Sequence, residues 1–304
     1  MIADIRHWRI GEVTVSRIVE VGQFADDISM LFADADADWL RQFGWLAPRF
    51  ITPAGQMLIS FQAFVVRTPT RRIMLDTCIG NDRQRRFDVF TNLRTDFLSD
   101  IAAAGCPADS IDTVLCTHLH FDHVGWNTHR VADRWVPTFP NARYLFGTKE
   151  WEHIEHLHSS GHAHASHYDD SIKPILDAGL ADFVTTDHRV CEEVWLEPTH
   201  GHTPGHVSVR IRSAGADAVI TGDLMHHPCQ CTVPDKLANF DEDQPLAART
   251  RREFLSRVDG RRMLVIGSHF AEPTAGWVER DRDTWKFFAQ EDGPLAGPIA
   301  GDRT

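Results

Sequence analysis

Long apolar runs, cysteine pairs and a surplus of positive charge are all absent from this 304-residue sequence. No segment approaches the ~18 uncharged apolar residues of a membrane-spanning helix, so no membrane partner is expected. Residues 1–20 carry charges and have no continuous apolar stretch, so no signal peptide is expected either. The six cysteines are scattered and form no C-x-x-C pair, which favours a reduced, cytoplasmic protein over a disulfide-rich secreted one.

Positive charge is too scarce for a nucleic-acid-binding protein. The chain has 31 Lys and Arg against 43 Asp and Glu, a net charge of −12 when the histidines are neutral. Nucleic acid selects a basic stripe or patch, and the arginine runs within 83–86 and 249–252 are too short to make one. We therefore expect a small-molecule substrate, with neither nucleic acid nor membrane as a partner.

The remaining composition fits one large folded domain. With 42% hydrophobic residues, a chain of 304 residues can bury a sizeable core. We expect a single domain over 1–290 and a loose tail over 291–304, where Gly and Pro are frequent. Apolar and alternating patterns predict strands over 13–19 and 57–66, and helical patterns predict helices over 34–45 and 95–105.

The most informative motif lies at residues 117–125, which read Thr-His-Leu-His-Phe-Asp-His-Val-Gly. Neutral imidazole nitrogens and carboxylate oxygens are ligands that suit zinc and similar divalent ions. The apolar, β-branched run over 111–116 predicts a buried strand, so the motif begins where that strand ends. Four side chains within six residues can bind a metal ion: His118, His120, Asp122 and His123.

Other apolar runs end in the same kinds of side chain. The predicted strand over 72–76 ends in Asp76, the one over 218–223 ends in Asp223, and the one over 263–269 ends in His269. A Gly/Pro-rich turn over 198–206 carries three more histidines: His200, His202 and His206. This pattern predicts a metal site along one edge of a sheet.

The ordered series of these motifs resembles the metallo-β-lactamase superfamily. That resemblance implies an α/β fold, a four-layer αββα sandwich in which two mixed sheets pack face to face with outer helices. It also implies two metal ions per chain, one held by His118, His120 and His202. The second ion would be held by Asp122, His123 and His269, with Asp223 bridging both ions.

The resemblance assigns supporting roles as well. Asp76 would orient the histidine loop by hydrogen bonds instead of binding metal, as partners of ligands often do. His202 is the ligand expected in its turn, whereas His200 and His206 would support it. The family usually has Gly where this chain has Cys78, which is then either a small buried residue or a thiol near the metals.

Two ions predict hydrolysis. Ions about 3.5–4 Å apart can share a water and lower its pKa toward about 7, and they stabilise charge that develops on the substrate oxygen. The segments over 76–81, 222–228, 241–245 and 268–273 resemble the methyl parathion hydrolase and N-acyl homoserine lactonase branch. We expect zinc, with manganese, cobalt or iron possible, and a lactone or carboxylic ester as substrate. Alternatives are an organophosphate triesterase, a β-lactam hydrolase or, in another class, an iron-dependent oxidoreductase.

For several residues the sequence allows more than one interpretation. His226, three residues after Asp223, either acts in catalysis on the substrate oxygen, together with Asp122 and Asp223, or is a supporting histidine. The aromatic residues of 23–56 either form a lid, form the arm of a homodimer or pack in the core. Eight aromatic residues that could reach the strand-end edge either line an apolar substrate pocket or pack in the core: Phe24, Phe32, Trp39, Phe43, Trp45, Phe87, Phe90 and Trp126. The Cys229-Gln-Cys231 pair either binds metal or lies in a plain loop. The histidine-rich segment over 153–167 either binds a third ion or is exposed to solvent.

Overall fold

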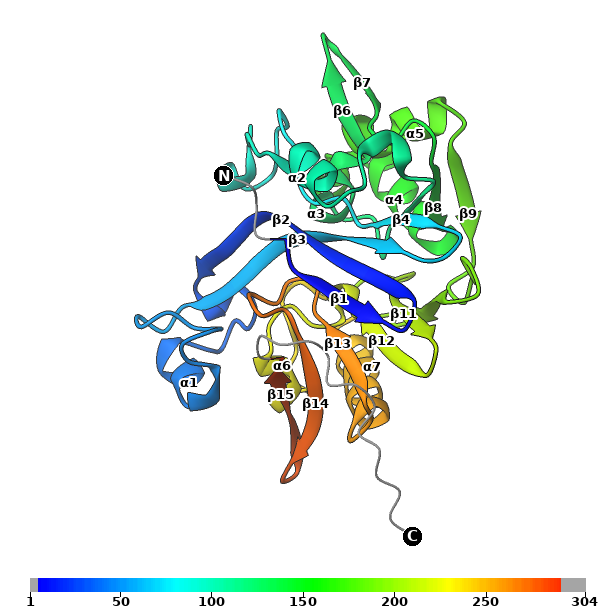
Figure 1. Ribbon diagram of the computed structural model, residues 1–304. Coiled ribbons are helices and arrows are strands. Elements are labelled where there is room, and N and C mark those ends of the chain that lie inside the picture. The colour runs from blue at the N-terminus through cyan, green and yellow to red at the C-terminus, as the bar shows by residue number, and fades with distance from the viewer. Residues whose placement is uncertain (1–4, 291–304) are drawn as a thin grey trace.

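Two mixed β-sheets packed face to face between outer helices form the protein (Figure 1). The computed structural model describes residues 5–290, so the predicted tail over 291–304 lies outside the described residues. The two sheets have seven and six strands. The predicted αββα sandwich is confirmed.

The first sheet contains three parallel strand pairs, β4–β5, β5–β8 and β8–β9, and is otherwise antiparallel. Its strands, in spatial order, are β1 (His7–Ile10), β2 (Val13–Asp26), β3 (Met57–Arg67), β4 (Arg72–Leu75), β5 (Thr113–Leu115), β8 (Arg143–Gly147) and β9 (Ala181–Val184).

The second sheet is antiparallel except for the pair β12–β13. Its strands are β10 (Val194–Pro198), β11 (Val207–Ser213), β12 (Ala216–Ile220), β13 (Met263–Ile266), β14 (Ala275–Asp281) and β15 (Thr284–Ala289). A separate hairpin, β6 (Thr128–Val131) with β7 (Arg134–Pro137), projects from the first half of the molecule (Figure 1).

Helices cover the outer faces of the two sheets (Figure 1). Those beside the first sheet are α2 (Phe97–Ala103), α3 (Phe121–Val124), α4 (Thr148–Ser159) and α5 (Lys173–Asp177). Those in the second half are α6 (Cys229–Thr232) and α7 (Gln244–Val258), and α1 (Ala37–Arg41) lies in the segment between β2 and β3. The helix predicted over 95–105 is confirmed as α2, and it ends before Gly105, whose φ of +77° favours glycine.

The central strands are apolar on both faces because each face is covered. In β3, Phe64 and Val66 belong to the core between the sheets, whereas Ala63 and Val65 face the helices. The same alternation divides β13, where Leu264 lies between the sheets and its neighbours point outward. Successive strand side chains point to opposite faces, so doubly covered strands read as continuous apolar runs.

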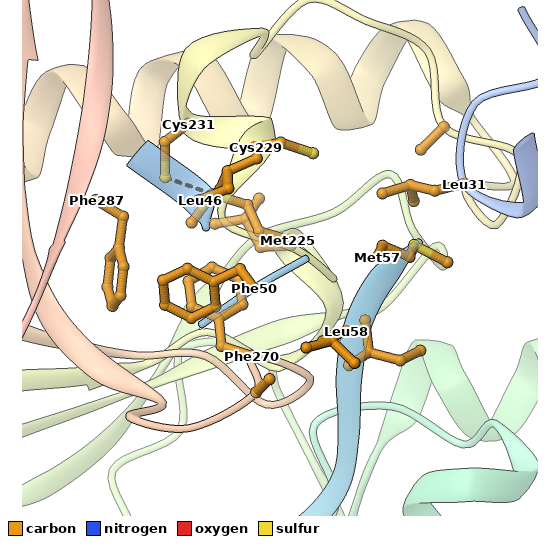
Figure 2. Packing of buried hydrophobic residues seen from close by; sticks show 14 of the residues in the cluster. Leu31, Leu46, Phe50, Met57, Leu58, Met225, Cys229, Cys231, Phe270 and Phe287 are labelled. Atoms are coloured by element: carbon orange, nitrogen blue, oxygen red, sulfur yellow. Dashed lines mark hydrogen bonds between the residues drawn. The ribbon is translucent and has the colours of Figure 1, made fainter. Parts of the chain in front are cut away.

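Most apolar side chains of the segment over 23–56 pack in or against the core, while its first part also lines the pocket described below. Helical structure there is limited to α1 and two 3-10 turns, Ile28–Met30 and Gly44–Leu46, so the helix predicted over 34–45 is shorter than expected. The Asp36 carboxylate caps α1 through Trp39 N, and Gly44, a poor helix former, opens the next turn. Phe50 lies 6.0 Å from Phe287 between ring centroids, inside a cluster that includes residues of the second sheet (Figure 2).

A buried histidine, His227, anchors this segment. Its Nε2 donates to the Phe50 carbonyl at 2.8 Å, and its Nδ1 accepts from Cys229 N at 3.2 Å. Burial lowers the pKa of His227 from 6.5 to about 4, so the neutral form is retained on folding.

Replacing His227 should therefore change the pH dependence of stability. The unfolded chain binds a proton at this position near pH 6.5 but the folded one does so only near pH 4. Neutral His227 therefore makes its full contribution to the free energy of unfolding above pH 6.5. As pH falls toward 4, this contribution decreases by about 3 kcal/mol. His227→Gln, which keeps a donor and an acceptor, should flatten the fall in unfolding free energy over this range. Urea unfolding of metal-free protein measures it, with the exposed His156→Gln as control; equal slopes would contradict the prediction.

Two further features concern what the described chain does not contain. Over residues 5–290, no helix is both long and apolar enough to cross a membrane. All six cysteines are free thiols. Cys229 and Cys231 lie in helix α6, buried in the core beside the second sheet (Figure 2), so the plain loop expected there is wrong; neither thiol belongs to a potential metal group among the described residues.

Candidate metal centre

The histidine motif occupies the turn that joins β5 to α3. β5 ends at Leu115, and His120 is the residue immediately before α3. Asp76, directly after the neighbouring strand β4, accepts hydrogen bonds from Thr117 N at 2.8 Å and from Thr117 Oγ1 at 2.9 Å. The parallel pairing of β4 with β5 brings both strand ends to one edge, so Asp76 fixes the path of the chain as it enters the motif.

The structure brings all the predicted ligands together at this edge. Asp223 follows β12, His269 follows β13, and His202 lies in the turn between β10 and β11. Over residues 5–290, the groups of potential ligand atoms lying within 4.8 Å of one another are His118/His120/His202, His118/His123/Asp223, Asp122/His123/His269 and His202/Asp223/His226. The first and third groups correspond to the two ion sites that the resemblance implies, and Asp223 lies between them.

The imidazole rings of His123 and His269 each donate a hydrogen bond from the nitrogen that faces away from the ligand cluster. This bond leaves the other ring nitrogen facing the cluster. His123 Nδ1 donates to Asp76 Oδ2 at 2.9 Å, and His269 Nδ1 donates to the Ser60 carbonyl at 3.0 Å. In the neutral rings both Nε2 atoms are then lone-pair acceptors, and they lie 3.2 Å apart. Two lone pairs at this distance need a cation between them, either a proton or a metal ion.

The ligand group His118, His120 and His202 repeats this arrangement. His202 Nδ1 lies 3.1 Å from Asp241 Oδ1, to which it donates, so His202 Nε2 presents a lone pair. That atom lies 3.0 Å from His120 Nδ1. Carboxylates or carbonyls on the outer nitrogen are the usual partners of metal-binding histidines, because they set the tautomer and the ring angle.

Two of the predicted ligands have a buried polar atom without a hydrogen-bond partner: His118 Nε2 and Asp223 Oδ1. An unsatisfied buried polar atom costs about 1–3 kcal/mol, and more if charged. Both atoms face the space that the predicted ligands surround. His118 Nε2 lies 3.8 Å from Asp223 Oδ2. Divalent metal ions satisfy both, so the donor set fits a metal centre.

The ionisation of His118, His120 and Asp223 agrees with this fit. For His123 and His269, burial alone would lower the pKa, but the carboxylates around them, Asp223 first, raise it in metal-free protein. Burial lowers the pKa of His118 and of His120 well below the ordinary value, so both are neutral imidazoles at pH 7. Burial would raise the pKa of Asp223, but the surrounding histidines, His123 first, hold it well below the ordinary value. Neutral imidazole and ionised carboxylate are the forms that bind metal.

The other two histidines of the 198–206 turn bond backbone groups and are not part of the ligand cluster. His206 Nε2 accepts from Asp223 N at 2.8 Å, and its Nδ1 lies 2.9 Å from the Thr199 carbonyl, to which it donates. His200 Nδ1 donates to the Pro204 carbonyl at 2.5 Å. In the turn, only His202 belongs to a potential metal group among the described residues, and His206 supports the backbone of Asp223.

Cys78 replaces the usual glycine at a position where glycine would be favoured. Its φ is +48°, a left-handed conformation that costs a non-glycine residue about 1–2 kcal/mol. The side chain is fully buried in the core beneath the first sheet. Burial, reinforced by the carboxylates of Glu20 and Asp76, raises the pKa of the thiol well above its ordinary value. Cys78 is therefore a neutral, buried thiol and belongs to no potential metal group among the described residues.

His226 lies against the bridging carboxylate. Its Nε2 is 3.2 Å from Asp223 Oδ2, and its ring stacks on that of His269 with centroids 5.6 Å apart. The other ring nitrogen, Nδ1, is buried without a partner. His226 also lines the pocket described below, so it can reach a bound molecule or a metal ion.

Supporting residues that sequence patterns did not single out surround the cluster. Glu150 at the start of α4 accepts from backbone groups of two ligand loops, and Arg251 on α7 pairs with Asp241 at 2.8 Å. Glu20 in β2 accepts from Ile79 N at 2.7 Å. In the sequence, only Glu20 stands out as an acid within an apolar stretch, whereas Glu150 and Arg251 lie in polar segments, and no sequence pattern names their partners.

One expectation about the histidine-rich segment is wrong. His167 is not exposed: only 1% of it is accessible, and its Nε2 donates to the Leu119 carbonyl at 2.7 Å. The π-helical turn Tyr168–Ile172 follows it, and the chain folds back beneath the histidine motif. Burial lowers the pKa of His167 to about 4. No third metal group involves 153–167 within the described chain.

A pocket of about 510 Å³ opens above the ligands. Its floor includes His120, Asp122, His202 and Asp223. Its walls are mostly apolar and come from the end of β2, from β3, from 85–90, from 163–167 and from 239–240. Concave, largely apolar pockets with a few convergent polar groups are typical small-molecule sites.

The predicted aromatic contacts divide between pocket and core. Phe24, Phe87 and Phe90 line the pocket, together with Phe61 and Phe121. The others, Phe32, Trp39, Phe43, Trp45 and Trp126, pack elsewhere: Phe32 is fully buried, and Trp126 stacks on Phe97 with centroids 5.4 Å apart. The pocket aromatics form a continuous chain that begins at His269, whose ring centroid lies 5.3 Å from that of Phe61.

Comparison with known proteins agrees with the geometry. Residues 62–269 match the model of the metallo-beta-lactamase superfamily. Among solved structures, a hydrolase named AbOPH in the beta lactamase superfamily superposes with a TM-score of 0.80 at 19% identity, covering 96% of this chain and 99% of the other. AidC, a dizinc quorum-quenching lactonase in complex with a product, N-hexnoyl-L-homoserine, superposes with a TM-score of 0.77 at 19% identity over the same shares. A probable metal-dependent hydrolase from Staphylococcus aureus superposes with a TM-score of 0.72 at 16% identity, over 94% and 100%. No curated protein matches the chain.

Proposed function

The chain belongs to the metallo-β-lactamase superfamily as a metal-dependent hydrolase, and from that premise we propose that it cleaves a lactone or a neutral carboxylic ester using two divalent ions. The observation that carries the proposal is the position of the ligand cluster, at the floor of a mostly apolar pocket of about 510 Å³. Zinc is the metal we propose, because imidazole and carboxylate ligands suit it and AidC is a dizinc lactonase.

The predicted ligands would form two ion sites. His118, His120 and His202 would hold one ion. Asp122, His123 and His269 would hold the other, and Asp223 would bridge the two. When bound, the ions would supply an activated water and polarise the substrate carbonyl. Asp76 and Asp241 fix the tautomers of His123 and His202 with the proton on Nδ1, so that the inward Nε2 atoms would present lone pairs to the ions, and the phenylalanine walls exclude water from the reacting bond.

Charges in the pocket favour a neutral substrate. The buried cation in its wall, Arg85, is neutralised by Asp170, with Nη1 2.8 Å from Oδ2. The other arginine in the lining, Arg86, is exposed. A substrate carboxylate placed deep in the pocket, as in a β-lactam, would find no unpaired arginine among the described lining residues. Uncharged lactones and esters need no such cation, so they are favoured over β-lactams.

The six phenylalanines of the pocket lining suit a substrate with an apolar arm: Phe24, Phe61, Phe87, Phe90, Phe121 and Phe240. Phe61 and Phe90 have ring centroids 4.7 Å apart, and Phe87 extends the wall 6.3 Å beyond Phe90. Phe87→Ala should lower kcat/KM about 10-fold for long-arm substrates and much less for short ones. Kinetics on an acyl-chain series measure this, with the exposed Phe183→Ala as control. A loss independent of chain length would contradict the assignment.

His226 is proposed to donate a hydrogen bond to the developing oxyanion or to protonate the leaving group. It lines the pocket and has a buried ring nitrogen without a partner. His226→Ala should lower kcat about 10²-fold or more with little change in metal content. Steady-state kinetics and metal analysis on the same preparation test it. An unchanged kcat with metal intact would remove His226 from catalysis.

Metal content and substrate turnover, measured on one purified sample, test the proposal as a whole. We expect about two zinc ions per chain and turnover of homoserine lactones or aryl esters above that of paraoxon-like triesters and a β-lactam. A preference for triesters would move the protein to the organophosphate hydrolases. Iron with oxygen consumption and no hydrolysis would overturn the proposal in favour of an oxidoreductase.

A further inference from the structure

The histidine-rich segment lies against the three-histidine half of the candidate centre. Leu119 is the residue between His118 and His120, so its peptide groups determine how far apart those two rings stand. Its backbone N donates to Glu150 Oε2 at 3.2 Å. Its carbonyl accepts from His167 Nε2 at 2.7 Å. Both polar groups of this one residue are therefore held by side chains from 148–167.

Glu150 also reaches the second loop of the same half. Its Oε1 accepts from Thr203 Oγ1 and from Gly205 N, both at 2.6 Å. Both residues follow His202 within the turn between β10 and β11. The two loops belong to different sheets, because the first follows β5 and the second joins β10 to β11. A single carboxylate thus ties together the loops that carry all three histidines.

The packing around this carboxylate leaves no room for adjustment. Glu150 is 2% exposed and His167 is 1% exposed. A Cβ placed on Gly205 would lie 2.9 Å from both Glu150 N and Glu150 Oε1, so the turn approaches α4 as closely as only glycine permits. Buried polar networks of this kind hold their members rigidly when every member has a partner.

We infer that Glu150 and His167 are positioning residues that set the spacing of His118, His120 and His202 for one metal ion. Neither side chain belongs to a potential metal group among the described residues, and each acts through Leu119 or the 203–205 turn. This inference rests on the metal-binding part of the proposed function and is independent of the substrate. It also gives the histidine-rich segment a role without a third metal ion.

Chemically graded variants separate positioning from general stability. In Glu150→Gln, the amide oxygen can still accept from Thr203 and Gly205, but the amide nitrogen faces the Leu119 N–H. In Glu150→Ala all three bonds are lost. His167→Leu removes the donor to Leu119, whereas His167→Gln keeps an N–H near the original Nε2. Matched controls are Glu152→Gln and His156→Ala, exposed positions on the same helix.

The test is competitive titration of zinc into metal-free protein against a chromophoric chelator, with a cobalt absorption spectrum and a thermal melt for each variant. We expect one of the two ions to bind about 10-fold more weakly in Glu150→Gln and about 100-fold more weakly in Glu150→Ala. His167→Leu should weaken the same ion, and His167→Gln should restore it. The second ion and both controls should match the wild type.

Unchanged zinc affinities for both ions in folded Glu150→Ala would overturn the inference, even if the melting temperature fell. Equal weakening of both ions would overturn it too, because the effect would then be general. Failure of the proposed function is a different result: a wild-type protein that binds zinc, shows the expected variant series and hydrolyses no lactone or ester.

Discussion

Removal of the divalent ions is expected to abolish hydrolysis by the wild-type protein and to lower its thermal stability. The ions are proposed to contribute several kcal/mol of transition-state stabilisation, which corresponds to a loss of about 10³-fold or more in kcat. The buried, inward-facing lone pairs of His123 and His269, 3.2 Å apart, would be left without the metal between them. Chelation followed by gel filtration, kinetics and a thermal melt measures both effects.

Adding metal ions back distinguishes the loss of activity caused by metal removal from damage to the protein during chelation. Zinc, manganese and cobalt should each restore activity to the metal-free protein, to different extents. At an ion concentration 100 times Kd, binding to the folded state alone adds about 2.7 kcal/mol to the free energy of unfolding. Full activity that persists after verified metal removal would contradict a metal-dependent mechanism.

Replacing Arg251 is expected to be among the most destabilising single changes. Its side chain is fully buried and pairs with Asp241 at 2.8 Å, and it also donates to the Leu224 carbonyl at 3.1 Å. Arg251→Met leaves the Asp241 carboxylate buried without its cation, at an expected cost of about 3–5 kcal/mol. Because Asp241 orients His202, zinc affinity should fall as well. Urea unfolding of the metal-free protein isolates the stability effect.

Two variants control this result. Arg252→Met removes the neighbouring, exposed arginine, which pairs with Asp235, and should cost about 1 kcal/mol or less. The double variant Arg251→Met/Asp241→Asn should regain part of the lost stability, since the uncompensated charge is gone while the Asn oxygen still accepts from His202. Equal destabilisation by Arg251→Met and Arg252→Met would show that the buried pair contributes little.

Many donors of the candidate centre could be predicted from the sequence because they follow shortly after a recognisable apolar strand. Apolar runs such as Met263–Ile266 are buried on both faces, and parallel or neighbouring strands deliver their ends to one edge of the sheet. A polar residue at the end of such a run, for example Asp223 or His269, is therefore placed by the strand itself. The order of the motifs along the chain then predicted the family, which the match over 62–269 shows.

The segment over 23–56 shows where sequence patterns lose accuracy. Its aromatic residues predict burial but do not specify against what. Phe24 lines the pocket, whereas Phe32 and Phe50 pack in the core of the second half. Apolar burial is non-directional, so composition alone cannot distinguish a pocket wall, an interface and a core.

The sequence by itself determined the candidate ligands, through the residues that follow its apolar runs, and the fold class, through the family resemblance that the ordered motifs carry. Only the tertiary structure decided which partners hold those ligands. Glu150 and Gly205 are 55 residues apart along the chain, and His167 and Leu119 are 48 apart. Hydrogen bonds between such distant residues depend on how the two sheets and α4 pack, and no local pattern encodes that packing.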